Sequence, residues 1–161
     1  MICRLTFPAL VLLLSGWGAF ASGEGDDRPT TRIVPAGPVI MGADNLDVAA
    51  GSDEFPTRRV DIKSDLAFGT TPVTRGQFAA FLHATDHDMT GGCWTLTPDG
   101  WAIDDAANWR APGFPQSDQH PVTCVSRDDA LVYLAWLSAT TGQVYRLPRE
   151  AEWVRAAGPS A

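Results

Sequence analysis

The chain has 161 residues, with 19 acidic and 12 basic side chains and a formal net charge of −7. The basic residues are scattered, and their one adjacent pair is Arg58 and Arg59. Phosphate backbones and anionic lipid surfaces are bound by clustered positive charge, so this composition argues against nucleic acid and membrane surfaces as partners.

The N-terminal segment is typical of a secretory signal peptide. Arg4 precedes an apolar run over residues 7–14, and Ala19 and Ala21 form a small-x-small cleavage pattern before a polar stretch. An uncleaved membrane anchor is the weaker alternative, because serine and glycine interrupt a run that would need about 20 apolar residues to span a bilayer. We therefore predict a signal peptide over residues 1–21 and a periplasmic or secreted protein without a membrane contact after cleavage.

The segment after the signal peptide is polar and rich in turn-forming residues. Residues 22–30 are predicted to be a flexible linker, and the folded domain is predicted to occupy residues 31–161. Short strands are expected at 32–34 and 39–41, on either side of a proline-containing turn, and a half-buried strand at 59–63. The chain length suits one domain.

Three helix starts follow along the chain. Thr74 with Gln77, and Ser126 with Asp129, have the spacing of a capping box, in which the cap and the third helical residue exchange hydrogen bonds. A third helix is expected after Pro148, with acidic residues in its first turn. The second helix is apolar almost all round, which predicts that it is the most buried element of the domain.

An irregular region rich in glycine, proline and aromatic residues separates the first two helices. Within it, residues 93–96 and 101–103 flank a Thr-Pro-Asp-Gly turn, which predicts a β-hairpin. We expect buried indoles to hold this part of the chain in place. The tryptophans in question are Trp94, Trp101, Trp109 and Trp136.

Cys93 and Cys124 remain once the signal peptide, which contains Cys3, is removed. Two cysteines in an oxidising compartment most often pair, so we predict a Cys93–Cys124 disulfide. The competing interpretation is a reactive or metal-binding pair. Such a pair needs basic neighbours or further soft ligands to hold thiolates, and none is adjacent in the sequence.

Several groups of residues have the side-chain types of a catalytic or metal site but lack the spacing or the further residues that such a site needs. His83 and His87 have the spacing of a zinc pair on one helix face, but the sequence places no third ligand. His120 and Ser126, with Asp128 or Asp129, have the residue types of a hydrolase triad, yet no strained nucleophile turn occurs and Ser126 already serves as a helix cap.

Glu150 and Glu152 do not form a convincing acid–base pair, because helical residues two apart point away from each other. Glu152 is expected to serve the helix start, and Glu150 the helix dipole or Arg146. We therefore assign no catalytic, cofactor-binding or metal-binding residue to this chain.

Five ordered motifs resemble the formylglycine-generating enzymes, also called sulfatase-modifying factors. The Arg146–Trp153 segment comes close to a family signature on its own. The motifs are Met41-Gly42; Thr71-Pro72-Val73-Thr74 leading to Gln77-Phe78 and Phe81; Trp109-Arg110-x-Pro112-Gly113-Phe114; His120-Pro121-Val122 with Val125-Ser126-x-Asp128-Asp129-Ala130; and Tyr145-Arg146-Leu147-Pro148-x-Glu150-Ala151-Glu152-Trp153.

The resemblance implies an irregular α+β fold of the C-type-lectin-like kind, incomplete at its C-terminal side. It also implies oxidation of a sulfatase cysteine to formylglycine with copper and dioxygen, with copper and calcium as cofactors of full-length members. The family keeps its catalytic cysteines beyond the segment matched here, so we assign no cofactor to this chain and expect it to be inactive alone. The implied partner is a sulfatase or another protein substrate. The alternative is a secreted lectin-like binding or accessory module.

The chain departs from the family pattern at three positions. Arg127 replaces a common tryptophan, Arg149 replaces a common threonine at a helix cap, and Val154 replaces a usual glutamate. Arg127 and Arg149 lie within the matched motifs and Val154 directly follows the last one, so the order of the motifs is intact.

Overall fold

The computed structural model describes residues 2–4, 29–44, 48–89 and 92–158. Most of the predicted signal peptide and linker, residues 5–28, lies outside this part of the chain. No helix among the described residues is long and apolar enough to cross a membrane.

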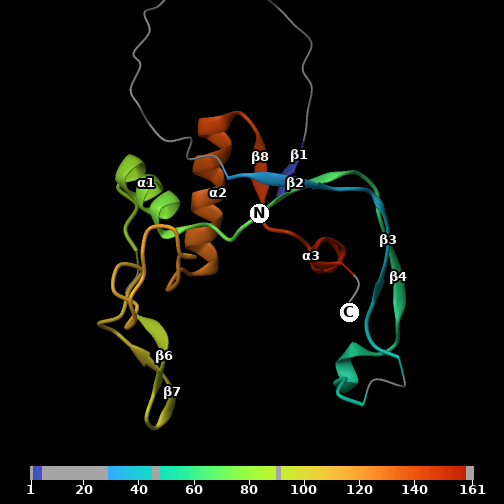
Figure 1. The fold of residues 1–161 in the computed structure, drawn as a ribbon, viewed down its shortest axis with the longest axis horizontal. Coiled ribbons are helices and arrows are strands. Elements are labelled where there is room, and N and C mark those ends of the chain that lie inside the picture. The colour runs from blue at the N-terminus through green and yellow to red at the C-terminus, as the bar shows by residue number, and fades with distance from the viewer. Residues whose placement is uncertain (1, 5–28, 45–47, 90–91, 159–161) are drawn as a thin grey trace, which may run out of the picture.

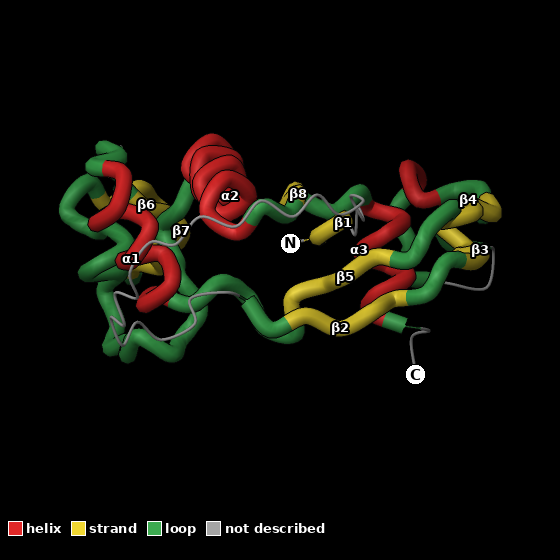
Figure 2. Tube along the Cα trace, turned by 90° about the horizontal axis from the view of Figure 1, so that it is seen from above, coloured by secondary structure: helices red, strands yellow, loops and turns green. Residues whose placement is uncertain are grey.

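A four-stranded antiparallel sheet lies in the middle of the fold, with the strand order β2-β5-β1-β8 (Figures 1 and 2). Its members are β1 (Ile2–Arg4), β2 (Thr31–Val34), β5 (Leu66–Gly69) and β8 (Val144–Arg146). The sequence predicted β2, and the other three strands were not foreseen. β1 belongs to the predicted signal peptide and pairs with β5 on one side and β8 on the other.

Two hairpins lie at opposite ends of the molecule (Figure 1). One joins β3 (Gly37–Met41) to β4 (Arg58–Ile62), with a short 3-10 turn, η1 (Ser52–Glu54), in the connecting loop. The other joins β6 (Cys93–Thr97) to β7 (Gly100–Asp104). The second hairpin has the turn that the sequence predicted, and Thr97 Oγ1 donates to the Gly100 carbonyl at 2.8 Å to close it.

The helices are α1 (Arg75–Thr85), α2 (Arg127–Thr141) and α3 (Glu150–Ala157). Both predicted capping boxes form: Thr74 caps α1 with Gln77, and Ser126 caps α2 with Asp129. α2 ends at Gly142, whose φ of 70° is a left-handed conformation that glycine adopts without a steric cost.

The core lies between α1 and α2. Phe78 and Phe81 from α1 are almost completely buried and contact Tyr133 of α2, with ring centroids 5.8 and 5.5 Å away. Trp109, from the loop before α2, packs edge-on against Phe78 at 6.0 Å. Such aromatic pairs stabilise beyond their buried area by about 1 kcal/mol each. This cluster holds the irregular region against the helices.

Two of the expectations about burial are wrong. Trp109 is buried and Trp136 is half-buried, but Trp94 and Trp101 on the β6–β7 hairpin are 65% and 68% exposed. The outer face of α2 is also exposed at Leu131 and Val132. β5, with every residue buried or half-buried, is therefore the more buried element, and α2 is not. The sequence shows which residues are apolar, but it does not show which of them another element covers.

One side chain of α3 forms hydrogen bonds to the bend between β2 and β3. The Arg155 guanidinium donates to the carbonyl groups of Pro35, Ala36 and Pro38, at 3.3, 3.3 and 3.0 Å. The guanidinium also lies against Gly37, where a Cβ would come within 2.8 Å of Arg155 Nη2. A cation near the C-terminal end of a helix is also favoured by the helix dipole.

Candidate functional site

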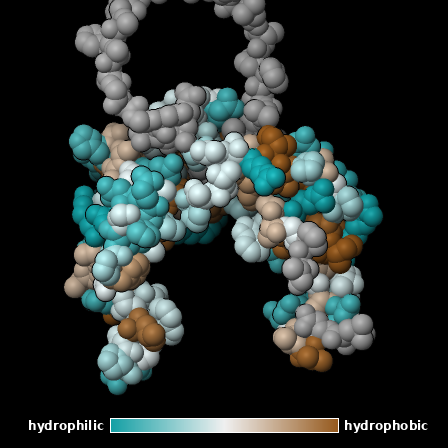
Figure 3. All heavy atoms as spheres, viewed as in Figure 1, coloured by the Kyte–Doolittle hydropathy of each residue, from teal (hydrophilic) through white to brown (hydrophobic). Residues whose placement is uncertain are grey.

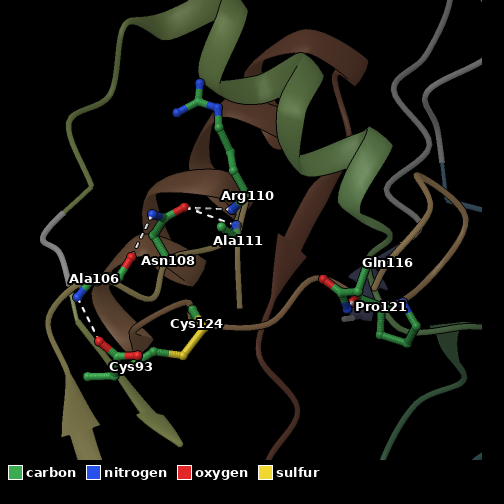
Figure 4. The surroundings of a disulfide bond; sticks show 9 residues. Cys93, Ala106, Asn108, Arg110, Ala111, Gln116, Pro121 and Cys124 are labelled. Carbon is green, nitrogen blue, oxygen red and sulfur yellow. Dashed lines mark hydrogen bonds between the residues drawn. A yellow bond between two sulfur atoms is a disulfide. The ribbon is translucent and has the colours of Figure 1, made fainter. Parts of the chain in front are cut away.

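The Cys93–Cys124 disulfide is present in the structure, as the sequence predicted, and Figure 4 shows its surroundings. Cys93 begins β6, while Cys124 lies in the loop before α2 with a left-handed φ of 58°. The two Cα atoms are 5.2 Å apart, and the bond closes a loop of 31 residues. It ties the base of the β6–β7 hairpin to the start of α2.

An open hollow of about 1180 Å³ lies beside Cys124, between the end of α1 and the loop around Trp109. Asn108 shapes one wall: its side-chain oxygen accepts hydrogen bonds from the backbone N–H groups of Arg110 and Ala111, at 2.9 and 3.2 Å (Figure 4). The Arg110 guanidinium lies 4.4 Å from the centre of the Trp109 ring, a cation–π contact. The hollow is lined by Ala79, Leu82, His83, Asp86, His87, Asp88, Met89, Asn108, Trp109, Arg110, Ala111 and Cys124.

A hydrogen-bonded chain of three side chains lies behind this hollow. His87 Nε2 is 2.8 Å from one oxygen of Asp129, and the other oxygen accepts from the Ser126 hydroxyl at 2.6 Å. Burial raises the pKa of Asp129, but the hydrogen bonds from Ser126 and His87 outweigh it, so the pKa lies below its ordinary value. Asp129 is therefore an anion that fixes both the cap of α2 and the ring of His87.

This arrangement is structural and not that of a hydrolase. In a triad the histidine binds the serine and the carboxylate orients the histidine, whereas here both Ser126 and His87 bind the carboxylate of Asp129. His120, the histidine considered from sequence, contacts Ser117 instead, with Nδ1 2.8 Å from the hydroxyl oxygen. Ser126 thus remains the helix cap that the sequence predicted.

His83 and His87 do not share a helix face. α1 ends at Thr85, Asp86 adopts a left-handed conformation with φ 51°, and His87 follows the cap and turns towards Asp129. Within the described residues, no three His, Cys, Asp or Glu side chains are close enough together to hold a metal ion. His83 lies exposed in the last turn of α1, and His87 is half-buried against Asp129.

The Arg146–Trp153 segment forms an ion pair at the start of α3. The Arg146 guanidinium donates to both oxygens of Glu152, each at 2.7 Å, and one of these oxygens also accepts from the Arg149 backbone N–H at 2.7 Å. The hydrogen bond from Arg146 is the largest influence on the Glu152 carboxyl and holds its pKa below its ordinary value. Glu152 serves the helix start, as predicted, but it is also the partner of Arg146, a role that sequence reasoning gave to the exposed Glu150.

The fold and this region together define a mixed α+β scaffold, stapled by a disulfide, in which long irregular segments are held by aromatic side chains and ion pairs. A family model for the sulfatase-modifying factor enzyme 1-like domain matches residues 19–161. The chain belongs to this family.

Curated relatives include enzymes with different names. Hercynine oxygenase of Mycolicibacterium smegmatis is 32% identical over 142 residues, which is 79% of this chain and 31% of the relative. The formylglycine-generating enzyme of Thermomonospora curvata is 31% identical over 149 residues, covering 77% of this chain and 47% of the relative. The chain therefore spans less than half the length of these two relatives.

A solved structure, PvdO from Pseudomonas aeruginosa, has the same fold. It superposes with a TM-score of 0.63 and 32% sequence identity, over 76% of this chain and 44% of that chain. This likeness confirms the α+β fold of the formylglycine-generating-enzyme kind that the motifs implied.

Proposed function

We propose that this chain is an exported member of the sulfatase-modifying-factor family that supplies part of the family scaffold and does not oxidise a substrate cysteine by itself. The observation that carries the proposal is the disulfide between Cys93 and Cys124, the two cysteines that follow the predicted signal peptide. Thiolate sulfur is the ligand that selects copper(I), and a disulfide offers no thiolate. The residues that the structure describes therefore do not fit a copper centre.

The similarity to these relatives supports a proposal about the scaffold of this chain more than a proposal about its reaction. One relative is named as an oxygenase of hercynine and another as a formylglycine-generating enzyme, although both match this chain equally well. A shared fold can hold different chemistries, because reactivity depends on side chains placed on it. The part of the domain spanned here shows shared architecture without naming a substrate.

The partner that we propose is a protein, either a sulfatase or another substrate of the family. The acidic composition, with a net charge of −7, supports a protein partner over nucleic acid. A lectin-like binding or accessory module is the second candidate. The observation that favours it is the pair of exposed indoles, Trp94 and Trp101, on the β6–β7 hairpin.

An oxidation assay tests the proposed lack of activity. The purified chain is incubated with copper, oxygen, a reductant and a peptide containing Cys-x-Pro-x-Arg, and the products are analysed by mass spectrometry. The Thermomonospora curvata enzyme serves as the positive control. We expect unchanged peptide with this chain, whereas catalytic formation of formylglycine would overturn the proposal.

Export is tested separately by the N-terminus of the protein recovered from the periplasm or medium. Cleavage after Ala21 predicts a mature protein that begins at Ser22, which intact-mass measurement can identify. A protein that remains in the cytoplasm with residues 1–21 attached would contradict this part of the proposal without affecting the assignment to the family.

A further inference from the structure

The β6–β7 hairpin presents one apolar face to solvent. Trp94 pairs with Ile103 across the two strands, and Leu96 pairs with Trp101, so the four side chains lie on the same face. Their exposed fractions are 65%, 60%, 71% and 68% in that order. The hairpin projects away from the helices, and Figure 3 shows apolar side chains on this arm at the lower left. Side chains of this size and number are rarely left in water.

We propose that this face is an interface between two copies of the chain, packed face to face around a two-fold axis. The arrangement of large and smaller side chains makes the face complementary to itself. Each tryptophan is diagonal to the other, and each is beside an aliphatic residue. A two-fold axis in the plane of the interface, along the strands or across them, therefore places every indole on an aliphatic side chain of the other copy.

Acidic residues lie at both ends of the hairpin. Asp99 is exposed in the turn at its tip, and Asp104 and Asp105 are exposed at its base. An axis along the strands brings tip to tip and base to base, whereas an axis across the strands brings each tip to the base of the other copy. Both arrangements bring like charges together, so charge does not select between the two axes.

The area of the face indicates what kind of dimer it can form. A large side chain offers roughly 150–250 Å², so the four exposed fractions correspond to about 500 Å² on each copy and about 1,000 Å² for the pair. This is near the lower limit of specific protein interfaces, which bury about 1,200 Å² or more. An interface of this size fits a reversible dimer and not an obligate one.

The disulfide gives the face its fixed position. Cys93 is the first residue of β6, so its bond to Cys124 anchors the strand that carries Trp94 and Leu96. An isolated two-stranded hairpin is only marginally stable in water. The covalent link therefore fixes the base of β6, and with it the apolar face, relative to the start of α2 while the partner copy is absent.

Sedimentation velocity of the full chain over a hundredfold range of concentration tests the interface. We expect a shift from monomer to dimer, and at least a tenfold weaker dimer in Trp94→Lys/Trp101→Lys. Trp153→Lys is the matched control, because Trp153 is 61% exposed on α3, away from the hairpin. The milder Trp94→Thr/Trp101→Thr variant, with threonine suited to strands, guards against loss of the hairpin.

Each other outcome overturns the proposal. A wild-type chain that stays monomeric over the whole concentration range shows that two copies do not pair through this face. The face would then be covered by the rest of a family domain or by another protein. Association that persists in both double variants comes from a different surface, such as the apolar run at residues 7–14. An equal loss in Trp153→Lys indicates general adhesion of exposed indoles. Near-UV circular dichroism and a count of free thiols show that each variant has kept its fold and its disulfide.

Discussion

The Arg146–Glu152 ion pair offers a sharp test of how the family motif stabilises this fold. The Glu152→Gln substitution keeps the shape of the side chain but removes its charge. It also places an amide N–H group where the guanidinium now donates. Since Glu152 is only 7% exposed, water cannot readily replace the lost contact. With one oxygen left, the side chain can no longer accept from both nitrogens of the Arg146 guanidinium and from the Arg149 N–H group at the start of α3.

The size of the effect follows from the burial of the two partners. Removing one member of a buried ion pair costs about 3–5 kcal/mol. The Arg146 side chain is 35% exposed, so water recovers part of this loss. We expect the free energy of unfolding to fall by about 2 kcal/mol, and the midpoint in urea to fall by about 1 M for a slope of about 2 kcal/mol per M.

Urea unfolding followed by circular dichroism measures this change. Glu150→Gln is the control, because Glu150 is exposed in the same helical turn, and we expect its effect to stay within about 0.5 kcal/mol. The reasoning is refuted if both variants are destabilised equally, or if Glu152→Gln unfolds at the wild-type midpoint.

The pH dependence gives an independent check on the same residue. The folded pKa of Glu152 is lowered from its ordinary value of 4.5, chiefly by the hydrogen bond from Arg146. Its contribution to stability is therefore fully present above pH 4.5 and is lost as the pH falls towards the lower folded value. Unfolding of Glu152→Gln should consequently depend less on pH below about 4.5 than unfolding of the wild type. Parallel curves for the two proteins would contradict the assignment.

Three further perturbations test other parts of the structure. Cys124→Ser opens the 31-residue loop and should lower the free energy of unfolding by about 3–4 kcal/mol, measured against the oxidised wild type by urea unfolding; an unchanged midpoint would exclude a stabilising role. Phe81→Ala removes a ring that is 0% exposed and should cost about 3–5 kcal/mol, whereas the exposed Phe114→Ala should cost less than about 1 kcal/mol. Removing residues 1–21 takes away β1 and leaves β5 and β8 without their shared neighbour. Amide hydrogen exchange should then accelerate in β8 at Val144 and Arg146, the neighbours of Tyr145, whose own N–H donates to Ser138 Oγ; equal exchange in both forms would show that β1 does not protect them.

Local chemistry made the helix starts and one hairpin predictable. Thr74 with Gln77, and Ser126 with Asp129, are three residues apart, and their hydrogen bonds depend only on the first helical turn. The turn before Gly100 is equally local. β5 and β8 escaped prediction because four and three residues carry too little periodicity. Their pairing depends on partners far away in the sequence.

The candidate site also has one part that the sequence predicted and another that it did not. The disulfide was predictable because only two cysteines follow the predicted signal peptide. The contact between His87 and Asp129 joins residues 42 positions apart, and Arg155 reaches Pro35 across 120 positions. No local pattern signals such contacts. The exposure of Trp94 and Trp101 was missed for a related reason, since an indole is apolar in either setting and only the fold determines what covers it.

A thiol titration of the protein tests the central claim most directly. We predict that the processed chain, beginning at Ser22, has no free thiol before or after denaturation, and that the intact chain has one, from Cys3. Neither Cys93 nor Cys124 should bind copper(I) unless a reductant first opens the bond. Two free thiols in the natively purified, processed protein, together with stoichiometric copper(I) binding, would contradict the assignment of a structural disulfide and of a scaffold without oxidase activity.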